Sequence, residues 1–216
     1  MSVKDYALTT AQRVADYAGL GTLSGTNLIV MERLVDSVTE FIENYTHRRY
    51  KKTTYTQELY NTENAPNLQL RNYPVDSSAV FSLERRTSGL NNDEWAGVDG
   101  QYFHVDNRNG VILSSGANKF DRTTQGYRVT YTAGYDYDNV ATFLSDTEAG
   151  DIEFAAWMLL EGIWNKRKGG FGIESEKIGD YSVKYRKEMM ENDDLKAILD
   201  KSIDLTLGSP LTPLQV

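Results

Sequence analysis

Two stretches with helical periodicity, separated by strand-like sequence in residues 53–135, limit most strongly the folds that this chain can adopt. The first begins at Thr26, and its apolar residues recur every three or four positions, which predicts an amphipathic helix: Leu28, Met31, Leu34, Val35, Val38, Phe41, Ile42 and Tyr45. The second, residues 151–166, is apolar around most of its circumference, so we expect a helix that is central or shared between subunits. The chain therefore returns to helix after forming a separate β region.

Two weaker signals add a short helix at each end. Thr9 or Thr10 can cap a helix that runs to Tyr17, and Gly19 supplies its stop. Near the other end, a last helix is indicated by an apolar run, with Asn192 or Asp193 as its restart: Met189, Met190, Leu195, Ile198, Leu199 and Ile203.

The β region is rich in β-branched and aromatic residues and is punctuated by Gly, Asn and Asp. Its clearest signal is Asn109-Gly110 between two strand-like runs, which favours a hairpin with a type I′ turn. The predicted fold is α+β, with a mainly helical core of about four helices, an inserted antiparallel β subdomain and an extended C-terminal tail. The expected divisions are 1–52 and 136–204 for the helical core, 53–135 for the β insertion, and 205–216 for the tail, called the arm.

Composition excludes several classes of protein. No window holds the roughly 18 uninterrupted apolar residues of a membrane span, so we expect no membrane contact. The N-terminus lacks the pattern of a secretory signal, which favours a protein that stays in the cytoplasm where it is made. The chain has no Cys, and therefore no disulfides, thiolate metal sites or Cys nucleophile.

Net charge narrows the partners. The formal charge is −8, and such a field repels a phosphate backbone, so sequence-specific DNA binding is not expected. Two basic clusters interrupt this acidity, and they are Arg48, Arg49, Lys51 and Lys52, and Lys166, Arg167 and Lys168. Each follows a predicted helix, where cations are favoured by the helix dipole. Two interpretations stay open: cations that stabilise helix ends, or a patch that faces a partner protein or DNA.

Catalytic, cofactor and metal sites are not predicted. The two histidines, His47 and His104, have no nucleophile context nearby. Residues 105–110 do not fit a calcium-binding loop, because Gly116 stands where the bidentate Glu is needed. The glycine-rich segments match neither dinucleotide nor P-loop spacing. Acidic residues are abundant, and a glycosidase needs only two that face each other, so the sequence leaves that pair open.

Several short motifs, taken in order, resemble the head-tail connector (head completion, adaptor) proteins of tailed bacteriophages. They are Ile-Glu-Asn-Tyr-Thr-His-Arg at 42–48, Tyr-Pro-Val at 73–75, the Asn109-Gly110 hairpin, Tyr-Thr-Ala-Gly-Tyr at 131–135, the apolar helix, and the stretch 175–185. Each motif is short, and the specificity comes from their order. Thr147-Glu148-Ala149-Gly150 replaces the proline usual near the start of the long helix.

The resemblance implies a structural virion protein at the head–tail junction. Such proteins form a ring, which we expect to hold twelve copies, that binds below the portal protein and extends the DNA channel toward a tail or stopper protein. Packaged DNA passes through the channel without sequence-specific binding. In this interpretation both basic clusters face the portal or the DNA.

The arm is too apolar for a solvated tail, while its prolines and glycine oppose a helix. We expect it to dock on the portal through Leu205, Leu207, Leu211, Leu214 and Val216, by strand addition or in extended form. Packing on its own subunit is the alternative. Two other function classes stay open: a monomeric β-rich binding module, and a carboxylate-dependent hydrolase.

Overall fold

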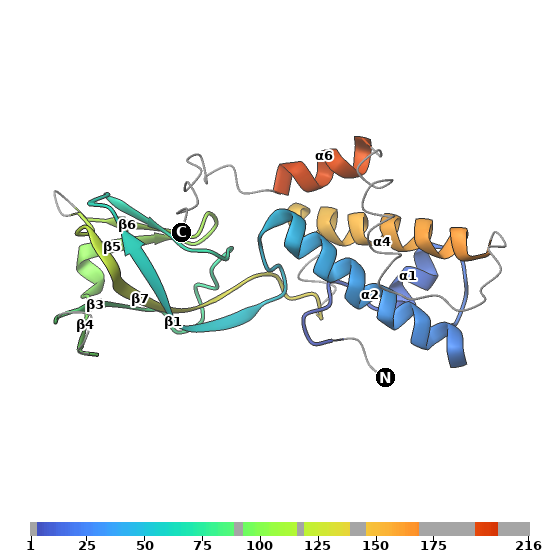
Figure 1. Ribbon diagram of the computed structural model, residues 1–216, viewed down its shortest axis with the longest axis horizontal. Coiled ribbons are helices and arrows are strands. Elements are labelled where there is room, and N and C mark those ends of the chain that lie inside the picture. Colours follow the sequence, from blue (N-terminus) through green and yellow to red (C-terminus); the bar gives the residue numbers. More distant parts are fainter. Residues whose placement is uncertain (1–3, 89–92, 116–118, 139–145, 169–192, 203–216) are drawn as a thin grey trace, which may run out of the picture. The chain divides into compact units, whose positions relative to one another are not determined.

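The computed structural model describes residues 4–88, 93–115, 119–138, 146–168 and 193–202, with the side chains of Thr147, Ser202 and residues 166–168 left out. The chain divides into two units (Figure 1). The helical unit comprises Met1–Arg48 and Asn139–Val216, and the β unit comprises Arg49–Asp138. The stretch 175–185 and the arm lie outside the described residues.

Four described α-helices build the helical unit: α1 (Ala11–Tyr17), α2 (Gly25–Thr46), α4 (Thr147–Lys168) and α6 (Asp193–Ser202). Thr10 caps α1, because its Oγ1 accepts a hydrogen bond from the Arg13 N–H at 3.3 Å. The helix α2 ends at Thr46, and the residue that caps it, His47, takes a left-handed conformation with φ of 57°. These bounds confirm the predicted helices at 26–45 and 151–166.

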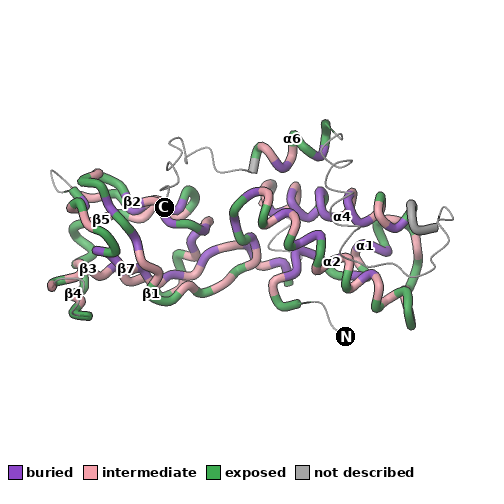
Figure 2. The backbone as a smooth tube through the Cα atoms, viewed as in Figure 1, coloured by how far each residue is buried: buried purple, intermediate pink, exposed green. Residues whose placement is uncertain are grey.

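The helical core forms where the apolar faces of α2 and α4 meet (Figure 2). The helix α2 buries Met31, Val35, Val38 and Ile42, as its periodicity predicts. The helix α4 buries residues on more than one side: Ile152, Ala155, Ala156, Leu159, Leu160 and Trp164. It contacts α1, α2 and α6, which agrees with the expectation of a central helix.

Seven described strands form two antiparallel sheets in the β unit. The first has the order β1-β7-β3-β4, with β1 at Thr53–Thr62, β7 at Thr123–Ala133, β3 at Ser82–Arg86 and β4 at Trp95–Gly97. The second has the order β2-β6-β5, with β2 at Asn67–Gln69, β6 at Val111–Ser114 and β5 at Phe103–Asp106. The short 3-10 helix η1 (Gly100–Tyr102) leads into β5.

Both sheets contribute to one core. Leu68 of β2 and Ile112 of β6 belong to the same buried cluster as Leu83 of β3 and Val129 and Tyr131 of β7. The long strand β7 is central, since it pairs with β1 on one side and with β3 on the other. The β region is therefore a unit with its own core.

The prediction of a mainly helical core is wrong. About 38% of the described residues are helical and 29% lie in strands, so the two structure types are comparable in extent. Hydrophobic periodicity is easiest to recognise in long helices. Strands of three to five residues are too short to show a clear alternation of apolar and polar residues, so the prediction gave them too little weight.

The predicted hairpin exists, but its turn differs. Strands β5 and β6 pair from Phe103 with Ser114 to Asp106 with Val111, which leaves a four-residue loop. In this loop Gly110 has a positive φ of 63°, and Asn109 is not among the residues that do. The Asp106 carboxylate accepts hydrogen bonds from the N–H and the Nδ2 of Asn109, at 3.3 and 2.8 Å. Asp106 therefore organises a longer loop than the two-residue type I′ turn.

None of the helices described in the structure is long and apolar enough to cross a membrane.

Candidate interaction surfaces

Backbone hydrogen bonds join the two segments through which the chain enters and leaves the β unit, residues 50–52 and 134–135, and this network is called the clamp. The Tyr135 N–H donates to the Tyr50 carbonyl at 2.6 Å, and the Lys52 N–H donates to the Tyr135 carbonyl at 2.9 Å. Between them, Gly134 has a φ of +104°, and a Cβ there would lie 2.6 Å from the Tyr50 carbonyl oxygen. Only glycine fits this approach, which explains the glycine of the Tyr-Thr-Ala-Gly-Tyr motif.

The Tyr-Pro-Val motif supplies a third segment of the clamp. The Tyr73-Pro74 peptide bond is cis, and the Pro74 carbonyl accepts a hydrogen bond from the Gly134 N–H at 2.9 Å. Two residues further on, the Asp76 N–H donates to the Thr132 carbonyl at 2.8 Å. Two motifs that lie far apart in the sequence thus meet in one backbone network.

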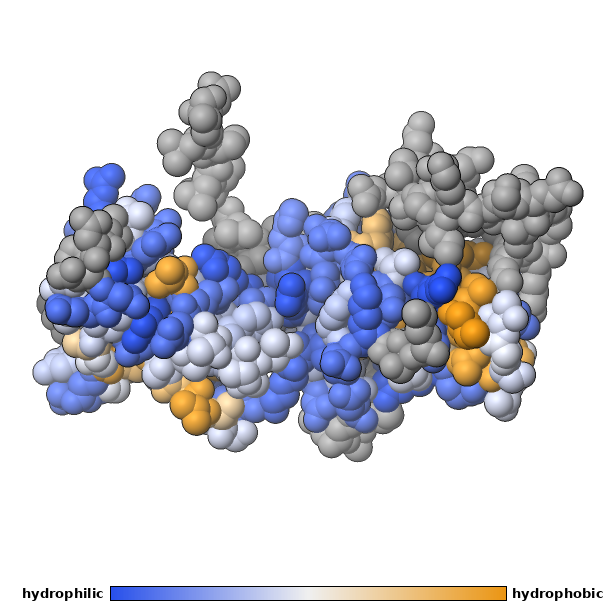
Figure 3. All heavy atoms as spheres, turned by 60° about the horizontal axis from the view of Figure 1, so that its bottom comes forward, coloured by the Kyte–Doolittle hydropathy of each residue, from blue (hydrophilic) through white to orange (hydrophobic). Residues whose placement is uncertain are grey.

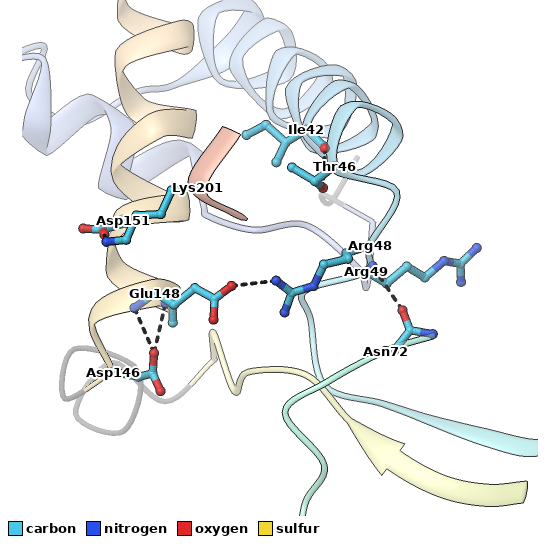
Figure 4. Close-up of polar contacts among 10 residues, drawn as sticks. Ile42, Thr46, Arg48, Arg49, Asn72, Asp146, Glu148, Asp151 and Lys201 are labelled. Atoms are coloured by element: carbon cyan, nitrogen blue, oxygen red, sulfur yellow. Dashed lines mark hydrogen bonds and ion pairs between the residues drawn. The ribbon is translucent and has the colours of Figure 1, made fainter. Parts of the chain in front are cut away.

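Arg48, the first member of the predicted basic patch, is buried in the helical unit with 4% of its surface exposed (Figure 4). Its guanidinium donates to the Glu148 carboxylate at 2.6 Å. The start of α4 that carries Glu148 is capped by Asp146, whose Oδ1 accepts from the N–H groups of Glu148 and Ala149 at 3.0 and 3.2 Å. Arg48 therefore ties the end of α2 to the start of α4.

The other three members belong to the β unit, and two are paired. Lys51 contacts Asp138 at 3.0 Å, and Lys52 contacts Asp76 at 2.5 Å. The Lys52 ammonium, with help from Ser78, lowers the pKa of Asp76 to about 2. Arg49 is exposed, and its guanidinium makes no ion pair with the described residues. The backbone N–H of Arg49 donates to Asn72 Oδ1 at 3.2 Å.

The second basic cluster lies on the last turn of α4. Lys166, Arg167 and Lys168 are the final three residues of this helix. Their backbone position is the one at which cations interact favourably with the helix dipole. The side chains of these three residues lie outside the described part of the structure.

An aromatic patch on the helical unit combines α1 with α4. The Tyr17 ring lies 5.9 Å from Phe154 and 5.4 Å from Trp157, centroid to centroid. Tyr17 is 39% exposed and Phe154 is 41% exposed. Figure 3 shows further hydrophobic side chains gathered at one end of the helical unit, and Ile29 of α2 is also exposed. Sequence reasoning missed this patch, because it joins residues from two helices; the apolar circumference of α4 was its one signal.

A buried acid also lies between α1 and α4. Glu153 is 1% exposed, and its Oε1 accepts from Arg13 at 3.1 Å. Burial raises the pKa of the Glu153 carboxyl, and Thr9 and Arg13 oppose that rise. The charged group that faces Glu153 among the described residues is this arginine, so the contact is an ion pair and not the pair of carboxylates that a glycosidase uses.

Metal-binding side chains do not gather in the described part of the chain, where no group of three His, Asp or Glu residues has a suitable arrangement. The arrangement as a whole offers surfaces for contact, in exposed aromatic side chains and an exposed arginine.

Comparison with known families matches residues 7–199 to the family described as "Head completion protein". The chain belongs to the head completion protein family. This match confirms the family suggested by the ordered motifs, and with it the prediction of a virion structural protein. Comparison with curated proteins gives no match.

Two solved structures are similar to this head completion protein. A chain from the "Neck of empty GTA particle computed with C6 symmetry", where GTA denotes a gene transfer agent, has a TM-score of 0.56 and 15% identity, covering 94% of this chain and 93% of that chain. A chain from the "Virion of native gene transfer agent (GTA) particle" has a TM-score of 0.49 and 16% identity, covering 93% and 91%. At these identities the first similarity shows the fold.

Proposed function

We propose that this head completion protein is a connector subunit that forms a ring below the portal protein and extends the DNA channel toward a tail or stopper protein. The family match over residues 7–199 carries the proposal. It is supported by a neck component of the same fold in a particle whose structure was computed with C6 symmetry. A sixfold axis accommodates the expected twelve copies, and closed rings of identical subunits follow from head-to-tail contacts.

The proposed mechanism is assembly without catalysis. Each subunit contributes a modest contact, and many such contacts on a symmetric platform add up to tight binding. The exposed pair Tyr17 and Phe154 suits such a contact, because aromatic side chains are enriched in interfaces. DNA passes through the channel without sequence-specific binding, in keeping with the net charge of −8.

Two parts of the chain are assigned to partners in this proposal. The arm docks on the portal through Leu205, Leu207, Leu211, Leu214 and Val216. The basic residues that face the portal or channel DNA are Arg49 and the cluster Lys166, Arg167 and Lys168, since Arg48, Lys51 and Lys52 are held by acidic neighbours.

A portal titration tests this assignment. Portal rings are immobilised, and binding of the full chain is compared with that of a chain truncated after Asp204 and of an Arg49→Gln variant. The proposal expects the truncation to weaken binding strongly and Arg49→Gln to weaken it in a salt-dependent way. Equal portal binding by all three proteins would show that neither the arm nor Arg49 contacts the portal.

A further inference from the structure

The β unit contains an open cavity of about 570 Å³ that lies between its two sheets. Four aromatic rings line it: Tyr102 of η1, Phe103 of β5, Tyr127 of β7, and Phe120. Phe120 and Tyr127 meet edge to face at 5.2 Å, and both are buried, so they form a fixed floor. Tyr102 is 51% exposed, which makes it the ring most accessible to a partner. The volume lies within the range of ligand-binding sites, and the four rings supply an aromatic surface for an occupant.

The polar groups of the cavity favour an uncharged occupant with backbone-like acceptors. Arg85 and Asp121 form an ion pair with each other, so their charges largely cancel. Asn64 and Ser114 also line the cavity, and both carry hydrogen-bond donors. Lys119 adds one exposed cation. Carbonyl groups suit these donors, whereas a strongly charged segment gains little from a neutralised pair.

We propose that this cavity receives an extended proline-containing segment, and that its occupant is residues 209–214 of a second copy of the chain. This segment reads Ser-Pro-Leu-Thr-Pro-Leu, and residues 205–216 include no charged side chain. A segment that binds as a polyproline II helix presents residues three apart on one edge, and Pro210 and Pro213 have this spacing. Such helices dock in aromatic-lined grooves and leave their carbonyls free to accept hydrogen bonds.

The length of the chain permits this contact. The last described helix ends at Ser202, and Pro210 follows eight residues later. Eight extended residues span up to about 28 Å, enough to reach a neighbouring copy in an assembly. The inference rests on the proposed function, because the arm can reach a second copy only if the copies are neighbours, as in the proposed ring. It assigns Leu211 and Leu214, which lie within residues 209–214, to the neighbouring copy in place of the portal, and it leaves Leu205, Leu207 and Val216 for the portal.

A peptide titration tests the cavity. A fluorescent synthetic peptide of residues 205–216 is titrated by anisotropy into the chain truncated after Asp204. Binding is expected, with a loss of about tenfold or more for Tyr102→Ala and for a peptide in which both prolines are Ala. The matched control is Val80→Ala, which shortens a side chain of the same unit that is 79% exposed and lies outside the cavity, and it leaves the affinity unchanged. Equal affinities for all proteins, or for both peptides, would overturn the cavity as the receptor.

A complementation experiment tests the second copy. The full-length Tyr102→Ala variant keeps the arm but lacks the cavity contact, and the truncated chain keeps the cavity but lacks the arm. Light scattering should detect a complex in their mixture that neither protein forms alone. If the full-length chain excludes the peptide while its mass remains that of a monomer, the arm fills the cavity of its own chain and the second-copy occupant is overturned. If the full-length protein does not bind the portal but the truncated chain still binds the peptide, the proposed connector function is wrong and the peptide-binding cavity stands.

Discussion

Replacing Gly134 by Ala gives the sharpest test of the clamp at the base of the β unit. At φ of +104° an L residue is strained by about 1–3 kcal/mol. The new Cβ would also lie 2.6 Å from the Tyr50 carbonyl oxygen and 2.8 Å from the Lys51 carbonyl carbon, and these backbone atoms have little freedom to move. Overpacking of this kind costs a further 1–3 kcal/mol or so. The expected loss in free energy of unfolding is therefore about 4 kcal/mol.

The measurement is chemical denaturation followed by circular dichroism, with thermal melting as a second readout. A loss of about 4 kcal/mol corresponds to a melting temperature lower by roughly 8–16 °C for a chain of this size. Gly97→Ala is the matched control in the same unit, because Gly97 is exposed, has no atom within 4 Å of an added Cβ, and does not have a positive φ. Its expected change is within about 0.5 kcal/mol. Equal stability of the two variants would refute the reasoning.

Three further predictions concern ion pairs and the aromatic patch. Asp76 has a pKa of about 2, below its ordinary value, so its stabilising charge is present above pH 4 and is lost between about pH 4 and 2. Urea midpoints of Asp76→Asn should therefore fall less steeply over that range than those of the natural chain. Glu148→Gln should destabilise the helical unit in thermal melts by about 1–3 kcal/mol, because Arg48 stays buried without its carboxylate. Phe154→Ser should reduce self-assembly in sedimentation velocity while leaving the melting temperature within a few degrees, since Phe154 is 41% exposed.

The helices were predictable because their signal is local. The residues of α2 with apolar spacing form its buried face, and the predicted cap residue Thr10 does cap α1. The proportion of helix to strand was not predictable in the same way. Strands such as β2 and β4 have three residues each and are defined by pairing partners far away in the sequence. Their pairing depends on tertiary contacts that no short window contains.

The basic cluster shows a similar limit. Arg48 and Arg49 are neighbours in sequence, yet one is buried against Glu148 and the other is exposed. The partner of Arg48 stands 100 residues further along the chain, so sequence alone could not separate a structural arginine from a surface one. The Tyr-Thr-Ala-Gly-Tyr motif was recognised as a family feature, but its physical reason, the approach of Gly134 to Tyr50, became visible only in three dimensions.

The most direct test of the connector proposal is the mass of the protein by light scattering, alone and after mixing with purified portal rings, followed by a count of copies in the complex by cryo-electron microscopy. The account predicts a closed ring of this chain stacked on the portal, formed either before or upon mixing. A protein that stays monomeric and leaves the mass of the portal ring unchanged would contradict it.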